Sequence, residues 1–125
     1  MNFGKQNIVI DKSFNFAVRI VKLYQYLNKN HKEYTLAKQV LKSGTSIGAN
    51  VEEAHGGISN SDFSNKISIA YKEARETLYW LRLLFATDYI TKKMFDSLLN
   101  DCDELCKITY SILDTARIKK RIKKS

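Results

Sequence analysis

The sequence predicts an all-α protein folded as an antiparallel up-down-up-down four-helix bundle. Three features of the chain support this prediction. Its 125 residues contain no proline, so no obligatory helix breaker is present. Apolar residues recur at intervals of three and four along four stretches, which is the period of a helix. The polar connectors between these stretches are short, and short connections place successive helices antiparallel. We therefore expect a single domain covering residues 1–125, with helices at about 11–30, 35–55, 60–87 and 91–118.

The first predicted helix carries one polar stripe on an otherwise apolar cylinder. The stripe consists of Lys12, Asn15, Arg19, Lys22, Gln25 and Lys29. Apolar residues, among them Phe14 and Val21, fill most of the other positions. So wide an apolar surface is typical of a helix that is covered on more than one side, which a monomeric bundle does not require. We expect Asp11 or Ser13 to cap this helix. Residues 1–10 are expected to form a poorly ordered lead-in, of which Ile8, Val9 and Ile10 can dock on the end of the bundle.

The second predicted helix has small residues in its interior. Gly44 and Gly48 lie four residues apart on a stripe that also contains Ala37, Val40, Ile47, Val51 and Ala54. A glycine inside a helix costs about 1 kcal/mol relative to alanine, so two of them indicate that another helix approaches closely. A polar line runs beside this stripe and comprises Gln39, Ser43, Ser46, Asn50 and Glu53. Two glycines at positions 56 and 57 then end the helix.

The third predicted helix shows two apolar faces. Ser59 or Ser61 can cap its start. Its core line is Phe63, Ile67, Ala70, Ala74, Leu78, Leu81 and Phe85. Ile69, Trp80 and Leu83 lie away from that line. A second apolar patch on a helix whose core face is already accounted for is typical of an interface, so we expect an oligomer contact at these three residues.

The fourth predicted helix contains both cysteines. Thr91 can cap its start, and its inward line is Phe95, Leu98, Cys102, Leu105, Thr109, Ile112 and Ala116. Cys102 and Cys106 are spaced four apart on one face, which favours reduced core residues over a disulfide framework. A metal site at this pair would need two further ligands.

Positive charge is concentrated at the end of the chain. The formal net charge is +8, and six positive charges fall within residues 117–125, the basic tail. They belong to Arg117, Lys119, Lys120, Arg121, Lys123 and Lys124. Such a cluster attracts phosphate with an affinity that falls steeply with salt, which predicts nucleic-acid contact. The alternative is a solubilising helix end favoured by the helix dipole, and the tail has no aromatic residue on which a base could stack.

Metal-dependent chemistry is a further alternative. Glu52 and His55 have the spacing of a carboxylate-bridged metal site in a bundle. Such a site needs that pair twice, and the only other histidine, His31, lies in a connector. We interpret His55 as a helix-end residue that interacts with the dipole, and we expect no metal and no cofactor.

The remaining carboxylates favour a structural interpretation. Glu53 and Glu73 flank the apolar stripes of the second and third helices, and we expect them to form a polar network with Asn50 and Arg75. Glu76 is within i,i+4 reach of a lysine at position 72. No phosphate-binding glycine loop and no set of nucleophile, base and orienting group accompanies them. The sequence therefore predicts no catalytic residue and no small-molecule substrate.

Composition bounds the location of the protein. Hydrophobic residues make up 44% of the chain and charged residues 27%, which argues against global disorder. No apolar run approaches the ~20 residues needed to cross a bilayer, and the first ten residues lack the apolar core of a secretory signal. We expect a cytoplasmic protein without a membrane partner.

Four blocks of this sequence resemble a known family. They are Asp11–Phe14, Ser43–Ala54, Ser61–Phe63 and Lys72–Leu84, and they resemble the bacterial four-helix-bundle family called 23S rRNA intervening-sequence proteins. The resemblance covers residues 11–118, and its central blocks hold Gly44, Gly48, Asn50, Glu53, Glu73, Glu76 and Trp80. It implies a bundle that assembles as a ring, a homopentamer. No catalytic residues are established for the family, so none are carried over.

The resemblance also extends, more distantly, to the accessory protein of diversity-generating retroelements. That bundle contacts nucleic acid and a reverse transcriptase, but this chain lacks a broadly basic body. We therefore favour a non-enzymatic, ring-forming helical protein associated with RNA or a ribonucleoprotein. The alternatives are a protein-adaptor scaffold whose tail docks an acidic partner and a metal-dependent bundle enzyme.

Overall fold

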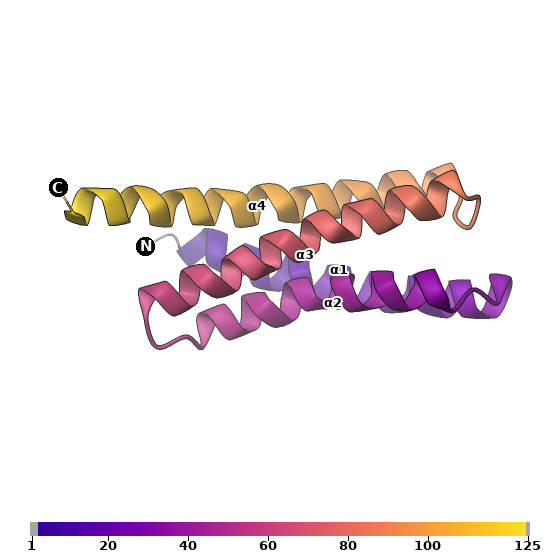
Figure 1. The fold of residues 1–125 in the computed structure, drawn as a ribbon, viewed down its shortest axis with the longest axis horizontal. Coiled ribbons are helices and arrows are strands. Elements are labelled where there is room, and N and C mark those ends of the chain that lie inside the picture. The colour runs from indigo at the N-terminus through magenta and orange to yellow at the C-terminus, as the bar shows by residue number, and fades with distance from the viewer. Residues whose placement is uncertain (1–2, 125) are drawn as a thin grey trace.

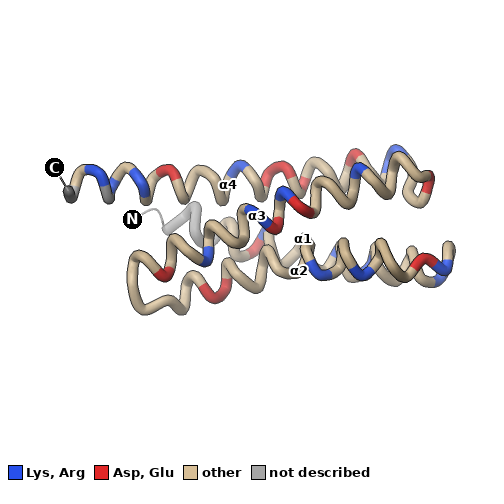
Figure 2. Tube along the Cα trace, viewed as in Figure 1, with Lys and Arg blue, Asp and Glu red and all other residues tan. Residues whose placement is uncertain are grey.

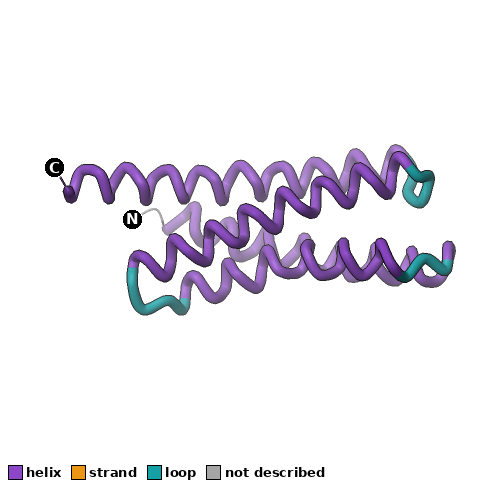
Figure 3. The backbone as a smooth tube through the Cα atoms, in the orientation of Figure 1, coloured by secondary structure: helices purple, strands orange, loops and turns teal. Residues whose placement is uncertain are grey.

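The protein forms four long helices. The computed structural model describes residues 3–124, with the side chains of residues 8–119, 121 and 122. The helices are α1 (Phe3–His31), α2 (Thr35–His55), α3 (Asn60–Ala86) and α4 (Lys92–Lys124). They run alternately up and down one long axis, which confirms the predicted antiparallel bundle (Figure 1). Loops lie only at the two ends of the bundle, and the described residues contain no strand (Figure 3).

Two helix boundaries differ from the prediction. Helix α1 begins at Phe3, so the expectation of a poorly ordered lead-in was wrong for residues 3–10. Val9 is fully buried, and Ser13 lies inside the helix, where its hydroxyl donates to the carbonyl of Ile10. Neither Asp11 nor Ser13 therefore caps the helix. Helix α4 was predicted to about residue 118, with the basic tail either extending it or fraying; it continues to Lys124, because lysine, arginine and isoleucine all tolerate a helix.

Side chains cap the starts of α2, α3 and α4, and the caps of α3 and α4 were predicted from the sequence. Ser59 caps α3 and Thr91 caps α4, each hydroxyl accepting from a backbone N–H three residues on, at 3.0 and 3.2 Å. The carboxylate of Glu33 performs the same task for α2, accepting from the backbone N–H of Leu36 at 2.9 Å. That cap was not predicted.

The buried face of α2 agrees with the prediction, except that Ser43, expected on the flanking polar line, is also buried; those of α3 and α4 differ in part. Phe63, Leu78 and Phe85 on α3 are only half-buried, and Thr77 and Leu84 take their places in the core. The buried line thus runs Ile67, Ala70, Ala74, Thr77, Leu81 and Leu84. On α4, Phe95 and Ala116 are half-buried, and Cys106 and Leu113 are buried. The prediction for α3 placed larger apolar residues in the core, but the residues that are buried are those at heptad spacing.

The glycines of α2 lie where α1 approaches most closely. We call Gly44 and Gly48 the glycine ridge. A Cβ added at Gly44 would lie 2.7 Å from Cγ1 of Ile20, and one added at Gly48 would lie 3.2 Å from the carbonyl oxygen of Ser13. Both contacts are with α1, which therefore rests directly on the ridge. The predicted reason for the two glycines is confirmed.

Substituting Gly48 tests the ridge. Because the obstacle is the backbone of α1 at Ser13, which cannot rotate away, Gly48→Leu should destabilise the protein by about 3 kcal/mol or more through overpacking. The measurement is the urea midpoint followed by circular dichroism. Ala49→Leu, at the exposed neighbouring position, should leave the midpoint nearly unchanged. Equal stability of the Gly48→Leu variant and the wild type would contradict close packing at this position.

Candidate functional site

A hydroxyl pair occupies the buried seam between α2 and α3. Ser43 and Thr77 are both fully buried, and their hydroxyl oxygens lie 2.9 Å apart in a hydrogen bond. Thr77 Oγ1 also lies 2.8 Å from the carbonyl oxygen of Glu73. Because both hydroxyls have partners, the seam is satisfied and structural. Thr77 was not predicted as a core residue, although its heptad spacing from Ala70 and Leu84 identifies the position.

The predicted network of Asn50, Glu53, Glu73 and Arg75 does not form with those partners. Glu53 instead makes an ion pair with Lys66 of α3 at 2.8 Å. The Asn50 amide donates to a carbonyl of its own helix, and Arg75 donates to the hydroxyl of Tyr71 at 3.3 Å. Side-chain reach across the seam, which the sequence does not specify, decides these pairings. This correction leaves no catalytic pair at the seam.

The predicted interface patch on α3 is partly covered. Ile69, Trp80 and Leu83 are half-buried, and Trp80 packs against the core. The Trp80 indole N–H donates to the carboxylate of Glu76 at 3.1 Å, where the sequence suggested a lysine partner for that glutamate. The exposed ring of Tyr79 meets Trp80 edge-on at 5.0 Å between centroids. The patch thus presents aromatic and aliphatic edges at the surface of α3.

The environment of Glu73 changes its ionisation. Burial raises the pKa of its carboxyl, nearby Glu76 raises it further, and Lys42 opposes the change. Both main causes disfavour the carboxylate in the folded state, so the charged side chain weakens the fold.

The candidate metal ligands are dispersed. The ring nitrogen Nδ1 of His55 lies 2.9 Å from the carbonyl oxygen of Val51, at the carboxyl end of α2 where the dipole favours it. The Cys102 thiol donates to the carbonyl of Ala74 at 3.3 Å, and its hydrogen bond with Cys106, together with burial, raises its pKa. Across the described part of the chain, no three side chains of His, Cys, Asp or Glu gather as a metal site.

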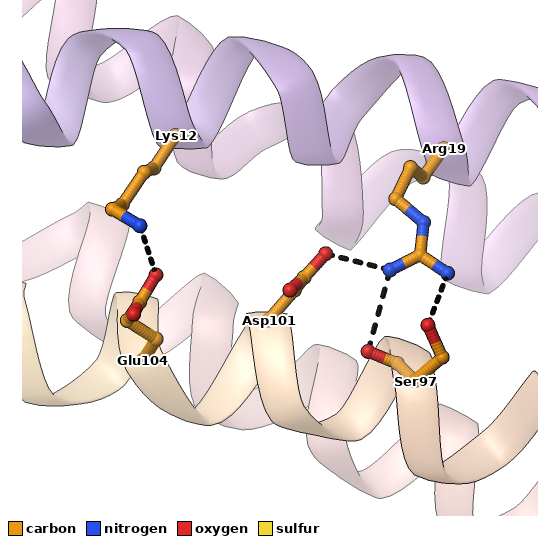
Figure 4. A network of polar contacts seen from close by, with 5 residues as sticks. All are labelled: Lys12, Arg19, Ser97, Asp101 and Glu104. Atoms are coloured by element: carbon orange, nitrogen blue, oxygen red, sulfur yellow. Dashed lines mark hydrogen bonds and ion pairs between the residues drawn. The ribbon is translucent and has the colours of Figure 1, made fainter.

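The seam between α1 and α4 is bridged by charged groups (Figure 4). Lys12 pairs with Glu104 at 2.6 Å, and Arg19 pairs with Asp101 at 2.6 Å. The Arg19 guanidinium also donates to the Ser97 hydroxyl at 2.8 Å. These groups are partly exposed, so each pair contributes little to stability, and less at high salt. The sequence analysis placed Lys12 and Arg19 on a polar stripe and did not identify their partners on α4.

The outer face of α1 carries exposed apolar side chains. Phe14 is 62% exposed, and Val18 and Val21 are each 40% exposed. Their spacing of four and three places them on one face of the helix. The core face of α1, which holds Phe16 and Ile20, points elsewhere. We call Phe14, Val18 and Val21 the outer apolar face; it agrees with the expectation that α1 has more apolar surface than one bundle covers.

The basic tail forms the last turns of α4. These turns project past the loop that joins α2 and α3, and lysines and arginines dominate them (Figures 1 and 2). Arg117, Lys119 and Arg121 are exposed. The side chains of Lys120, Lys123 and Lys124 lie outside the described residues. Within the described residues, none of the helices has an apolar stretch of the length that crossing a membrane requires.

The pKa of Glu73 leads to a prediction of pH dependence. Since the folded pKa is raised, stability falls as pH rises from the unfolded carboxyl pKa to the folded one, and the loss persists at neutral pH. Glu73→Gln should therefore be more stable than the wild type at pH 7. The two proteins should be equally stable at about pH 3, below the usual carboxyl pKa of about 4.3. An equal gain at both pH values would assign the effect to packing.

Comparisons with known proteins agree with this fold. The family described as 23S rRNA-intervening sequence protein matches residues 5–111. A crystal structure of a protein with unknown function from the S23 ribosomal protein family of Bacteroides thetaiotaomicron VPI-5482 is 53% identical to the chain, with a TM-score of 0.87. The match covers 88% of this chain and 98% of that one. The comparison with curated proteins gave no match. Since the family match spans both the glycine ridge and the α3 block, the chain belongs to the 23S rRNA-intervening sequence protein family.

Proposed function

We propose that the protein is a non-enzymatic, ring-forming bundle that associates with RNA or a ribonucleoprotein in the cytoplasm. The observation that carries the RNA association is the basic tail, which extends as a helix beyond the body of the bundle (Figure 1). The family name and the ribosomal protein family of the structural neighbour also support an association with RNA or a ribonucleoprotein. No catalytic residue and no cofactor is part of the proposal.

The outer apolar face of α1 supports assembly. Covering its three side chains would remove apolar surface from water, at roughly 25 cal/mol for each Å². The α3 patch of Ile69, Trp80 and Leu83 offers a second apolar surface on another helix. Two different surfaces on one chain allow a head-to-tail contact, and a head-to-tail contact that closes makes a ring. The family resemblance sets our proposed number at five copies.

The basic tail supports RNA contact through its phosphates. Arg117, Lys119 and Arg121 are exposed on a projecting helix, so a polyanion can approach them without meeting the body. Contact with phosphate releases counterions and is independent of base sequence. The tail therefore suits binding to RNA backbone and gives no base recognition by itself.

Removing the outer apolar face tests assembly. Wild-type protein should show several times the 14.4 kDa mass of one chain in light scattering. Phe14→Glu with Val18→Glu should reduce the mass to that of one chain, because two charges would be buried in the contact without partners. Asn15→Glu, at an exposed position of the same helix, is the control. A wild-type mass of 14.4 kDa would contradict the ring.

Neutralising the basic tail tests RNA contact. The six tail residues Arg117, Lys119, Lys120, Arg121, Lys123 and Lys124 are changed to Gln in the full-length chain. Fluorescence anisotropy with labelled RNA should show at least about a hundredfold loss of affinity near 0.1 M salt, and a salt slope smaller by about 4. Lys72→Gln with Arg82→Gln, both exposed on α3, should retain affinity within a few-fold. Binding insensitive to salt, or unaffected by the tail changes, would contradict the proposal.

A further inference from the structure

A second cluster of positive charge lies in the segment from residue 22 to residue 42. This segment contains five lysines and one acidic residue, Glu33, and thus carries +4. The lysines are Lys22, Lys29, Lys32, Lys38 and Lys42. With +8 on the whole chain and +6 on the basic tail, the remaining residues sum to −2. The near-neutral body therefore divides into one basic segment and an acidic remainder.

The charges of this segment are available to solvent. All five lysines are exposed, and among the described side chains none of the five forms an ion pair. Glu33 turns its carboxylate to the start of α2, where its two oxygens accept from the backbone N–H of Leu36 at 2.9 and 3.0 Å. The negative charge of Glu33 therefore lies at the amino-terminal end of α2. Lys42 interacts electrostatically with Glu73 across the seam between α2 and α3.

Aromatic rings lie among these lysines. Tyr34, in the loop, is 52% exposed. The exposed ring of His31 meets the rings of Tyr26 and Tyr89 edge-on, each at 5.5 Å between centroids. Two backbone hydrogen bonds hold the short loop to the end of α1, from Lys32 to Asn28 and from Glu33 to Leu27. The rings and lysines therefore sit on a fixed turn.

The cluster lies at the end of the bundle opposite the basic tail. The contact between His31 and Tyr89 shows that the α1–α2 loop and the α3–α4 loop meet there. Figure 1 places this end and the C-terminus at opposite extremes of the long axis. We call Lys29, His31, Lys32, Tyr34 and Lys38 the hairpin end. It is a separate surface from the tail.

We propose that the hairpin end binds single-stranded RNA, with its lysines on the phosphates and the rings of Tyr34 and His31 stacked on unpaired bases. This inference rests on the proposed association with RNA. Exposed rings among lysines suit a single strand, because only unpaired bases offer their faces for stacking. A duplex would use the lysines alone. The hairpin end thus supplies the aromatic residues that the basic tail lacks.

The test measures anisotropy of the full-length protein with a labelled single-stranded RNA of about 15 nucleotides and with an RNA duplex of the same length. Lys29→Gln with Lys32→Gln and Lys38→Gln should weaken single-strand binding about tenfold or more and reduce the salt slope by about 2. Tyr34→Ala should weaken single-strand binding at least about fivefold, with the salt slope and duplex binding unchanged. Lys72→Gln with Arg82→Gln is the control.

The outcomes separate this inference from the proposed function. If the tail variant loses binding while the hairpin-end variants bind as the wild type does, the proposed RNA site at the hairpin end is refuted. The proposed association of the protein with RNA then stands. If the wild type binds neither RNA, both proposals fall. An equal effect of Tyr34→Ala on single strand and duplex, or no effect on either, overturns the stacking role. Circular dichroism of each variant confirms that these exposed substitutions leave the helices intact.

Discussion

The close approach of α1 to the glycine ridge of α2 is the constraint on which the rest of the structure depends. At Gly48 the neighbour is the backbone of α1 itself, so the distance between the two helices has little tolerance for a side chain. With α1 held there by Ser13 and Ile20, its rotation about its own axis is set. Phe14 and Val18 then face away from α2. The exposed apolar face is thus a consequence of the ridge, since α1 cannot turn that face inward without losing the contact.

The seams of the bundle differ in character. Helix α2 packs against α1 and α3 through small and apolar residues, with the Ser43–Thr77 hydrogen bond as a buried polar contact. Helix α4 packs mainly against α3, where Cys102 reaches the carbonyl of Ala74. Between α1 and α4 the contacts are partly exposed ion pairs, which water and salt weaken (Figure 4). The α1–α4 seam is therefore the least strongly held of the four.

Sequence reasoning succeeded where one residue type has one physical explanation. Glycines inside α2 predicted close packing, and Ser59 and Thr91 predicted helix starts, because each of these residues acts locally. It failed where the outcome depends on neighbours in space. Leu78 was preferred to Thr77 for the core, since the hydroxyl partner that makes Thr77 acceptable lies 34 residues away. The partners of Glu53 and Arg75 were wrong for the same reason, and the interface and RNA surfaces stay predictions.

Net charge illustrates how a sum over the chain conceals what the fold does with charge. Between the helices, acids and bases pair with one another, as Glu53 does with Lys66 and Asp101 with Arg19. Lysines and arginines outnumber acidic residues in the hairpin end and in the basic tail, which lie at the two ends of the long axis. In the proposed ring, rotational symmetry would repeat both clusters once in every copy. Five weak sites on one assembly bind a long polyanion far more tightly than one, because after the first contact the others act at high effective concentration. If both proposals hold, assembly through the outer apolar face and RNA binding through the ends would therefore be coupled: a monomer would retain each contact but lose the avidity.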